Sequence, residues 1–297
     1  MVARRIARSI AGCLIASIAM SASAEEPVDR SDAASEVLQS AQFYSSFDTT
    51  TTADYGQGDL RLWTRYGQPA RGNIVEKLGI DEKRVRLVTG GVQGGAIELI
   101  EQLPDDGFLF YRAAGKLAPR DKGWGGTVSL WLKGNLADLN KHYCDPIMVV
   151  QNRYNNGAVW CDFTPEQPRD LRLGLFSKLP EGKTAPELPE SQQPIVRAKA
   201  PSFSPDAWHH LALTWDHFDT GRADGTATLY LDGRPITSIK NQPADMHWQL
   251  DRVRMFLGSA FVGLLDEMAT FDRPLTPAQV ALLHSEPELL SKLKKKP

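Results

Sequence analysis

The residues able to act as acids, bases or nucleophiles do not form a catalytic motif in this sequence. The six histidines are accompanied by no Gly-x-Ser-x-Gly elbow, the usual setting of a hydrolase serine. Glu98 and Glu101 are three apart, which points them to opposite faces of a strand, and the adjacent Asp266 and Glu267 diverge in the same way. Glycoside hydrolysis needs two carboxyl groups that face one cleft. The sequence therefore favours a binding role over catalysis.

Aromatic residues in or beside the expected loops are candidates for ligand contact. They are Trp124, Tyr143, Tyr154 and Trp160, and aromatic faces are common platforms for sugars and apolar side chains. Asp219 lies in an acidic, histidine-containing loop and is a further candidate for polar contacts. The alternative for each aromatic residue is a place in the core, and the alternative for the acidic loop is ordinary solvated turn chemistry.

Two cysteines, Cys144 and Cys161, remain once an N-terminal leader is removed. In an oxidising compartment an isolated pair is more often a disulfide than a metal site, because zinc normally takes four ligands. Closing the short loop between them would stabilise the fold by about 3 kcal/mol. We therefore predict a disulfide, with two buried free thiols as the alternative.

The N-terminus has the pattern of an export signal. Three arginines precede an apolar run from Ile10 to Met20, and small residues follow. This order is typical of a cleavable signal peptide, here residues 1–24, and the run is shorter than the roughly 20 residues of a membrane-spanning helix. We predict a secreted or periplasmic protein, the alternatives being an uncleaved anchor, twin-arginine export and lipoprotein anchoring at Cys13.

The charge of the exported chain argues against nucleic acid as a partner. Removing residues 1–24 leaves 31 Lys and Arg against 36 Asp and Glu, a net charge of about −5. Nucleic-acid binding depends on clustered basic residues that neutralise phosphates. The lysines that cluster lie in a basic C-terminal tail, residues 286–297, which we interpret as solvated.

Strand and turn signals dominate the chain from Phe43 onward. Short β-branched and aromatic runs alternate with Gly, Pro, Asn and Asp, which is typical of strands and their turns. The predicted strands cover residues 84–89, 96–99, 108–111, 127–133, 147–151, 158–163, 171–176, 209–215, 226–231, 253–257 and 263–271. Asp232-Gly233 predicts a hairpin turn, and Thr276-Pro277-Ala278-Gln279 predicts the start of a helix.

This pattern predicts an all-β fold, a two-sheet antiparallel jelly-roll sandwich with a short C-terminal helix. Residues 25–41 are expected to form a linker or short helix, and residues 42–285 the domain. The proline-rich residues 178–204 predict a long surface loop, and loops of this length are usually functional or disordered.

Five segments of the last third carry a family resemblance. They are WHHLALTWD at 208–216, LYLDGRPI at 229–236, FLG at 256–258, FVGLLDE at 261–267 and FDRPLT at 271–276. In this order and spacing they resemble the laminin-G-like jelly roll of the concanavalin A-like lectin/glucanase superfamily. The resemblance implies two packed antiparallel sheets of about twelve to fourteen strands.

The resemblance also implies a structural calcium site between the first and last strands. Its ligands would be Asp266 and Asp48, completed by carbonyls and water because calcium takes six to eight oxygens. The alternative is that Asp266 caps a strand through backbone hydrogen bonds. Glucanases of the superfamily carry a Glu-x-Asp-x-x-Glu strand motif that this chain lacks, which again disfavours hydrolysis.

These observations favour an exported, non-catalytic module that binds a glycan or another extracellular polymer. One alternative is an adhesive domain that binds an extracellular protein, since one fold serves many functions. The other is a divergent polysaccharide-cleaving enzyme.

Overall fold

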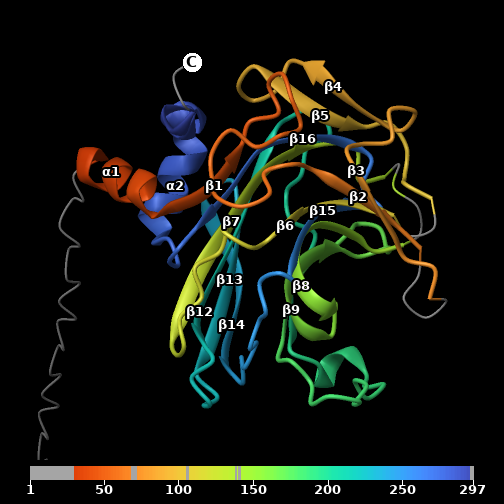
Figure 1. Cartoon of the computed structure of the whole chain (residues 1–297), viewed down its shortest axis with the longest axis vertical. Coiled ribbons are helices and arrows are strands. Elements are labelled where there is room, and N and C mark those ends of the chain that lie inside the picture. The colour runs from red at the N-terminus through yellow and green to blue at the C-terminus, as the bar shows by residue number, and fades with distance from the viewer. Residues whose placement is uncertain (1–29, 68–71, 105–106, 138, 140–141, 295–297) are drawn as a thin grey trace, which may run out of the picture.

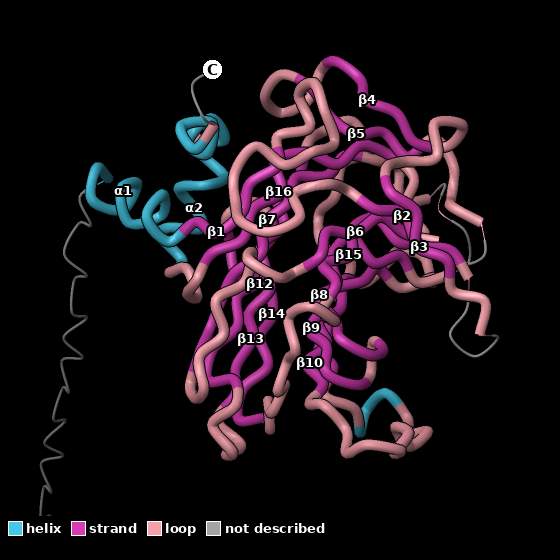
Figure 2. The backbone as a smooth tube through the Cα atoms, viewed as in Figure 1, coloured by secondary structure: helices cyan, strands magenta, loops and turns pink. Residues whose placement is uncertain are grey.

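The computed structural model describes residues 30–67, 72–104, 107–137, 139 and 142–294, so the predicted signal peptide and Cys13 lie outside it. The described residues form two eight-stranded antiparallel sheets (Figures 1 and 2). The first sheet runs in the order β14 (Arg234–Gln242), β13 (Gly225–Leu231), β12 (His209–Phe218), β7 (Trp124–Lys133), β16 (Gly263–Phe271), β5 (Gly95–Leu99) and β4 (Val85–Thr89), with β1 (Ala41–Ser45) also paired to β16. The second runs in the order β11 (Ile195–Ala198), β10 (Leu171–Phe176), β9 (Asn156–Phe163), β8 (Cys144–Arg153), β15 (Arg254–Ser259), β6 (Phe108–Arg112), β2 (Trp63–Tyr66) and β3 (Val75–Leu78).

The core lies between the two sheets and follows from the period of two along each strand. On β7, Val128, Leu130 and Leu132 are fully buried in the main hydrophobic cluster, as the alternation predicts. The neighbouring residues of β7 face outward, where the Ser129 hydroxyl lies 2.8 Å from His210 Nε2. The predicted two-sheet jelly roll is therefore confirmed.

Helices cover the outer face of the first sheet. They are α1 (Arg30–Ser40), α2 (Pro277–Ser285) and the 3-10 helix η3 (Pro287–Leu293), and they lie beside β1 and β7 (Figure 1). A second hydrophobic cluster joins Val37 of α1 and Val280 of α2 to Tyr230 and Phe271 of the sheet. This packing leaves the outer face of the second sheet as the one without a helical cover among the described residues.

The predicted local signals form as expected. Asp232 and Gly233 have φ values of 50° and 75° and join β13 to β14, because both residue types tolerate the left-handed region. The hydroxyl of Thr276 accepts from the Gln279 N–H, and the Gln279 side chain completes the capping box at the start of α2.

The structure differs from the sequence predictions in the number of strands and in the segments 178–204 and 286–297. The described residues hold sixteen strands, more than the twelve to fourteen implied by the family resemblance. The predicted loop 178–204 contains a short 3-10 helix, η2 (Glu190–Gln192), and the edge strand β11, which pairs with β10. Within the predicted tail, η3 buries Leu289 and Leu290 against the helical layer.

The predicted disulfide between Cys144 and Cys161 is wrong in this structure, where both thiols are free and fully buried. The register of β8 and β9 explains the difference, since Cys144 lies opposite Phe163 and Cys161 lies opposite Ile147. Both side chains belong to the main core cluster, and burial raises the pKa of both thiols. The two residues serve as small core side chains.

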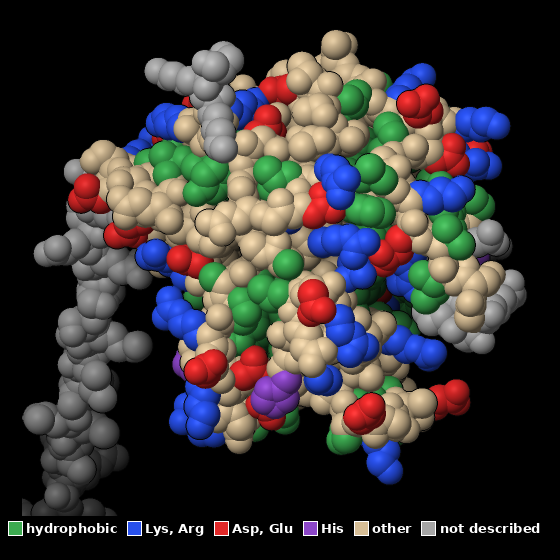
Figure 3. Space-filling view, viewed as in Figure 1, with side chains coloured by type: hydrophobic (Ala, Val, Ile, Leu, Met, Phe, Trp, Pro, Cys, Tyr) green, Lys and Arg blue, Asp and Glu red, His purple; other side chains and the backbone are tan. Residues whose placement is uncertain are grey.

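Charged and apolar side chains are mixed on the face of the molecule that Figure 3 draws. Figure 3 shows basic, acidic and hydrophobic side chains intermixed over β2, β3 and β15. In the described part of the chain, no helix has the length and apolar character needed to cross a bilayer.

Lys116 is a charged residue buried in the fold. Its ammonium donates to the carbonyls of Gln57 at 3.2 Å and Ala114 at 3.4 Å and lies 5.9 Å from the ring centre of Phe43. The side chain is fully buried, and this burial lowers its pKa to about 8. The folded state thus disfavours the charged form, which the unfolded chain holds up to about pH 10.4.

We therefore expect the free energy of unfolding to rise as pH increases from about 8 to about 10.4. In this range Lys116 takes up a proton when the protein unfolds, and that uptake becomes less favourable as the pH rises. Lys116→Met should be more stable than wild type at pH 7, by at most about 3 kcal/mol, and this advantage should shrink by pH 10.5. Urea unfolding of both proteins at the two pH values measures the difference. A constant difference between the two proteins would contradict this assignment.

Candidate functional site

The outer face of the second sheet carries a row of apolar side chains that crosses seven strands. Residues directly opposite each other on paired strands share a face, so the row can be followed strand by strand. It runs through Trp63, Phe110, Phe256, Met148, Trp160, Gly174 and Ile195. This face is the uncovered one, which makes it the natural place for a ligand.

Trp160 lies near one end of this row and forms the base of the pocket described below. Gly174 lies opposite it on β10, and a Cβ at Gly174 would come within 2.3 Å of the indole, so the glycine lets the ring lie across the strand. The indole N–H donates to the Tyr154 carbonyl at 2.7 Å, and the ring stacks on Phe176. With 1% of its surface exposed, Trp160 supports the site from below and offers no open stacking face.

A buried ion pair stands beside Trp160. Arg172 of β10 lies opposite Asp162 of β9 and donates to both of its carboxylate oxygens, at 2.7 and 2.5 Å. Its remaining terminal nitrogen donates to Glu190 of η2 at 2.5 Å. The ring of Tyr143 lies 4.0 Å from the guanidinium carbon, a cation–π contact. Arg172 thus joins two strands, the η2 loop and one of the predicted aromatic residues.

A third acid of this region, Asp145, differs from Asp162 and Glu190, because the interactions that the structure shows include no hydrogen bond from an arginine to it. It lies at the irregularity in β8 between Cys144 and Ile147. Burial, reinforced by the charge of Asp162, raises the pKa of Asp145 well above its usual range. The two hydrogen bonds from Arg172 favour the ionised form of Asp162. Burial outweighs these bonds and raises the pKa of Asp162 as well, so both acids favour their protonated forms more than an exposed carboxyl group does.

These residues surround a pocket of about 430 Å³, a size typical of small-molecule sites. Its lining comprises Tyr143, Asp145, Met148, Tyr154, Trp160, Asp162, Arg172, Glu190, Gln193 and Ile195. Tyr143 and Tyr154 are 42% and 54% exposed, so their rings stand open at the rim. We call this cavity the tyrosine pocket. It combines open aromatic faces with fixed hydrogen-bonding groups.

The structure brings three of the five predicted ligand-binding residues into this pocket, namely Tyr143, Tyr154 and Trp160. Trp124 and Asp219 lie elsewhere. The Trp124 indole N–H donates to Asp219 at 2.7 Å, and its ring packs in the core against Trp215, so neither residue belongs to the pocket.

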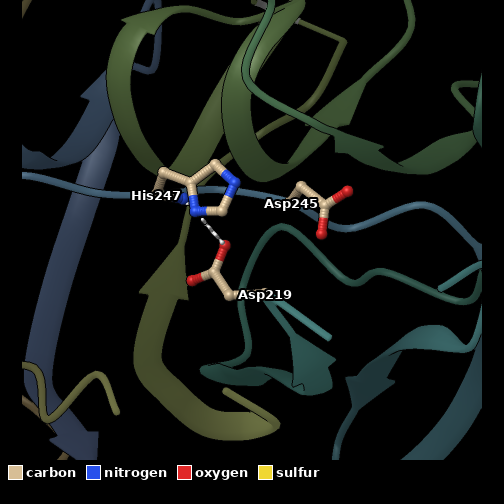
Figure 4. Close-up of side chains that lie close together, drawn as sticks. All are labelled: Asp219, Asp245 and His247. Carbon is tan, nitrogen blue, oxygen red and sulfur yellow. Dashed lines mark hydrogen bonds and ion pairs between the residues drawn. The ribbon is translucent and has the colours of Figure 1, made fainter. Parts of the chain in front are cut away.

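Asp219 takes part in a different cluster, with Asp245 and His247 (Figure 4). One possible ligand atom from each residue lies within 4.8 Å of the others, and the His247 ring and the Asp219 carboxylate face each other. The carboxylates already accept backbone N–H groups, Asp219 from His247 at 2.8 Å and Asp245 from Gly221 at 3.1 Å. The cluster therefore holds the turns at residues 219–221 and 245–247 together.

The predicted calcium ligands, Asp48 and Asp266, meet at the turn between β4 and β5. Asp266 accepts N–H groups from Val92 at 2.7 Å, Gln93 at 3.4 Å and Glu267 at 2.8 Å. Asp48 accepts the Gly95 N–H at 2.9 Å and pairs with the ammonium of Lys294.

The partners shown for these two carboxylates are donors, whereas a calcium site needs converging oxygens. In this structure backbone N–H groups and the Lys294 ammonium occupy the two carboxylates. They tie the segment after β1, the strand β16 and Lys294 to the β4–β5 turn.

Sequence reasoning missed Asp145, Asp162, Arg172 and Glu190. The sequence did contain a signal for two of them. Asp162 and Arg172 carry opposite charges, and each lies within an otherwise apolar strand, β9 and β10, which pair in the sheet. Such residues are seldom buried unless paired.

Comparison with known proteins places the fold. A family model described as the concanavalin A-like lectin/glucanases superfamily matches residues 122–281, more than half of the chain. No curated protein sequence matches the chain.

Two solved structures are similar in fold. Domain 4 of AbnA, an extracellular GH43 arabinanase of Geobacillus stearothermophilus in complex with arabinotriose, has a TM-score of 0.52 and 19% identity, and the match covers 82% of this chain and 98% of that domain. The Trypanosoma rangeli sialidase has a TM-score of 0.50 and 10% identity over 87% of this chain and 34% of the sialidase. At these identities the likeness concerns the fold alone.

The ion pair gives a direct test of the pocket's construction. Arg172→Gln should lower the free energy of unfolding by about 3–5 kcal/mol, because Asp162 is then left as an uncompensated buried charge. Asp162→Asn combined with Arg172→Gln should recover much of that loss. Urea denaturation of the two variants measures both effects, and a double variant no more stable than the single one would contradict the assignment.

Proposed function

Because the chain belongs to the concanavalin A-like lectin/glucanases superfamily, we propose that it is an exported, non-catalytic module that binds a glycan in the tyrosine pocket. The observation that carries this proposal is the pair of open rings, Tyr143 and Tyr154, above a floor of fixed polar groups. Export rests on the N-terminal sequence pattern alone.

The pocket suits a polyhydroxyl ligand. Sugars present apolar C–H faces and hydroxyl edges, and tyrosine rings can contact the former. Asp145, Asp162 and Glu190 supply polar carboxyl groups, and Arg172 already orients the last two. Ordering these groups before the ligand arrives reduces the entropic cost of binding. The arabinotriose complex of the fold relative makes short arabinans a sensible first probe.

The same groups favour binding over hydrolysis. Glycoside cleavage needs one carboxyl group as acid and a second, free carboxylate as base or nucleophile. Asp145 suits the first role, but both oxygens of Asp162 are held by Arg172, and Glu190 is held by Arg172 and Arg197. Because arginines bind both of these carboxylates, neither is free to act as the base or nucleophile.

A protein-binding role is the second candidate, and one observation favours it. Strand β3 is an edge of the second sheet, and Ile74, Val75 and Leu78 are 43%, 48% and 52% exposed there. Exposed apolar edges are sites of contact with other chains. This role would use the sheet edge and leave the tyrosine pocket unused.

We expect the mature chain to bind at least one saccharide on an array that includes arabinotriose. Tyr143→Ala and Tyr154→Ala should each weaken that binding about tenfold or more, because each removes an open stacking face. Ile100→Ala, an equally exposed apolar residue after β5, serves as the control and should bind as wild type does. A blank array, or equal losses in all three variants, would contradict the proposal.

A structural calcium at Asp48 and Asp266 stays a separate proposal. An ion there would have to displace Lys294 from Asp48 and the N–H groups of residues 92 and 93 from Asp266. The tyrosine pocket shares no residue with this place. We expect glycan binding to survive EDTA, measured on the same array. Binding lost with EDTA and restored by calcium would show that the ion supports the site.

A further inference from the structure

A second cavity, of about 500 Å³, adjoins the tyrosine pocket. Tyr154 and Gln193 line both cavities. The second one lies between the end of β10 and the proline-rich loop that follows it, and its apolar wall includes Leu175, Phe176, Leu179, Ala185, Pro186 and Leu188. We call it the leucine pocket.

The two cavities differ in chemistry. Three acids and one arginine line the tyrosine pocket, whereas the charged residue lining the leucine pocket is Glu187. Leu188 is 40% exposed at the rim of the leucine pocket. An apolar side chain left open beside an apolar hollow favours an apolar ligand group, because covering both removes that surface from water.

The loop that forms the outer wall of the leucine pocket is held in place. The Leu179 N–H donates to the Asn156 side chain at 2.8 Å, and the Leu175 N–H donates to the Pro194 carbonyl at 3.1 Å. Between these ends, the Gln193 side-chain amide donates to the Leu188 carbonyl at 2.6 Å. The prolines of the loop further restrict its backbone. The leucine pocket is therefore present before a ligand arrives.

The same loop couples the two cavities. Glu190 lies two residues after Leu188, and Arg172 binds it from the floor of the tyrosine pocket. The ion pair that orders the polar cavity thus also sets the wall of the apolar one. Tyr154 stands between them, with its carbonyl fixed by the Trp160 indole and its ring 54% exposed.

We propose that the leucine pocket takes an alkyl or acyl substituent carried by the glycan that the tyrosine pocket binds. This inference rests on the proposed function and names its ligand class: a saccharide with a covalently attached apolar group. The sugar contacts Tyr143 and Tyr154, and the substituent passes Tyr154 to reach Leu188.

The test compares methyl and hexyl glycosides of glucose, galactose and arabinose by isothermal titration calorimetry with the mature chain. For a sugar that binds, the hexyl glycoside should bind at least about tenfold more tightly, since burying two methylenes is enough for that gain. Leu188→Ser should remove most of the difference between the two glycosides. Leu78→Ser, the matched exposed leucine on β3, should keep it.

The outcomes separate this inference from the proposed function. Equal affinities for methyl and hexyl glycosides, with both weakened by Tyr143→Ala, would overturn the inference and leave glycan binding intact. A hexyl gain that Tyr143→Ala does not affect would show an apolar site independent of the sugar, which also overturns it. No binding of any glycoside, together with a blank glycan array, would overturn the proposed function itself.

Discussion

The proposed site depends on the ion pair between Arg172 and Asp162. Two charges taken out of water are tolerated only when they are paired and hydrogen-bonded, so this pair fixes the geometry of everything that touches it. It joins β9 to β10, holds η2 through Glu190, and places its guanidinium under Tyr143. Asp162 also adds to the effect of burial, which raises the pKa of Asp145. One pair thus sets the shape and the rim of the tyrosine pocket.

The rest of the fold determines why the site lies on the second sheet. Each strand buries one face in the common core, and α1, α2 and η3 cover the outer face of the first sheet. The outer face of the second sheet has no such layer among the described residues, yet it carries an apolar row that crosses seven strands. Arginines lie over parts of that row, as Arg65 does over Phe256 and Arg112 over Trp63. At the β9–β10 end the side chains instead leave hollows, which are the two cavities.

The fold was predictable from the sequence because its signals are local. Period-two alternation on β7, the Asp232-Gly233 turn and the capping box at Thr276 each specify their own conformation. The site was predictable only in part. Tyr143, Tyr154 and Trp160 stand out by residue type, but their meeting with Arg172 and Glu190 depends on strand register and on a loop that folds back, which no local pattern records. The disulfide prediction failed for the same reason, since spacing along the chain does not give the offset between Cys144 and Cys161 across two strands.

The most direct test of the account is a hydrogen-exchange footprint of the mature chain, free and saturated with the saccharide that binds it most tightly. The account predicts slower amide exchange at residues 143–162 and 172–193, the strands and loop around the tyrosine pocket, with little change on β4, β5 or β14. Protection confined to the edge strand β3, or to the turns that hold Asp219 and Asp48, would contradict it and place ligand binding on another surface of the sandwich.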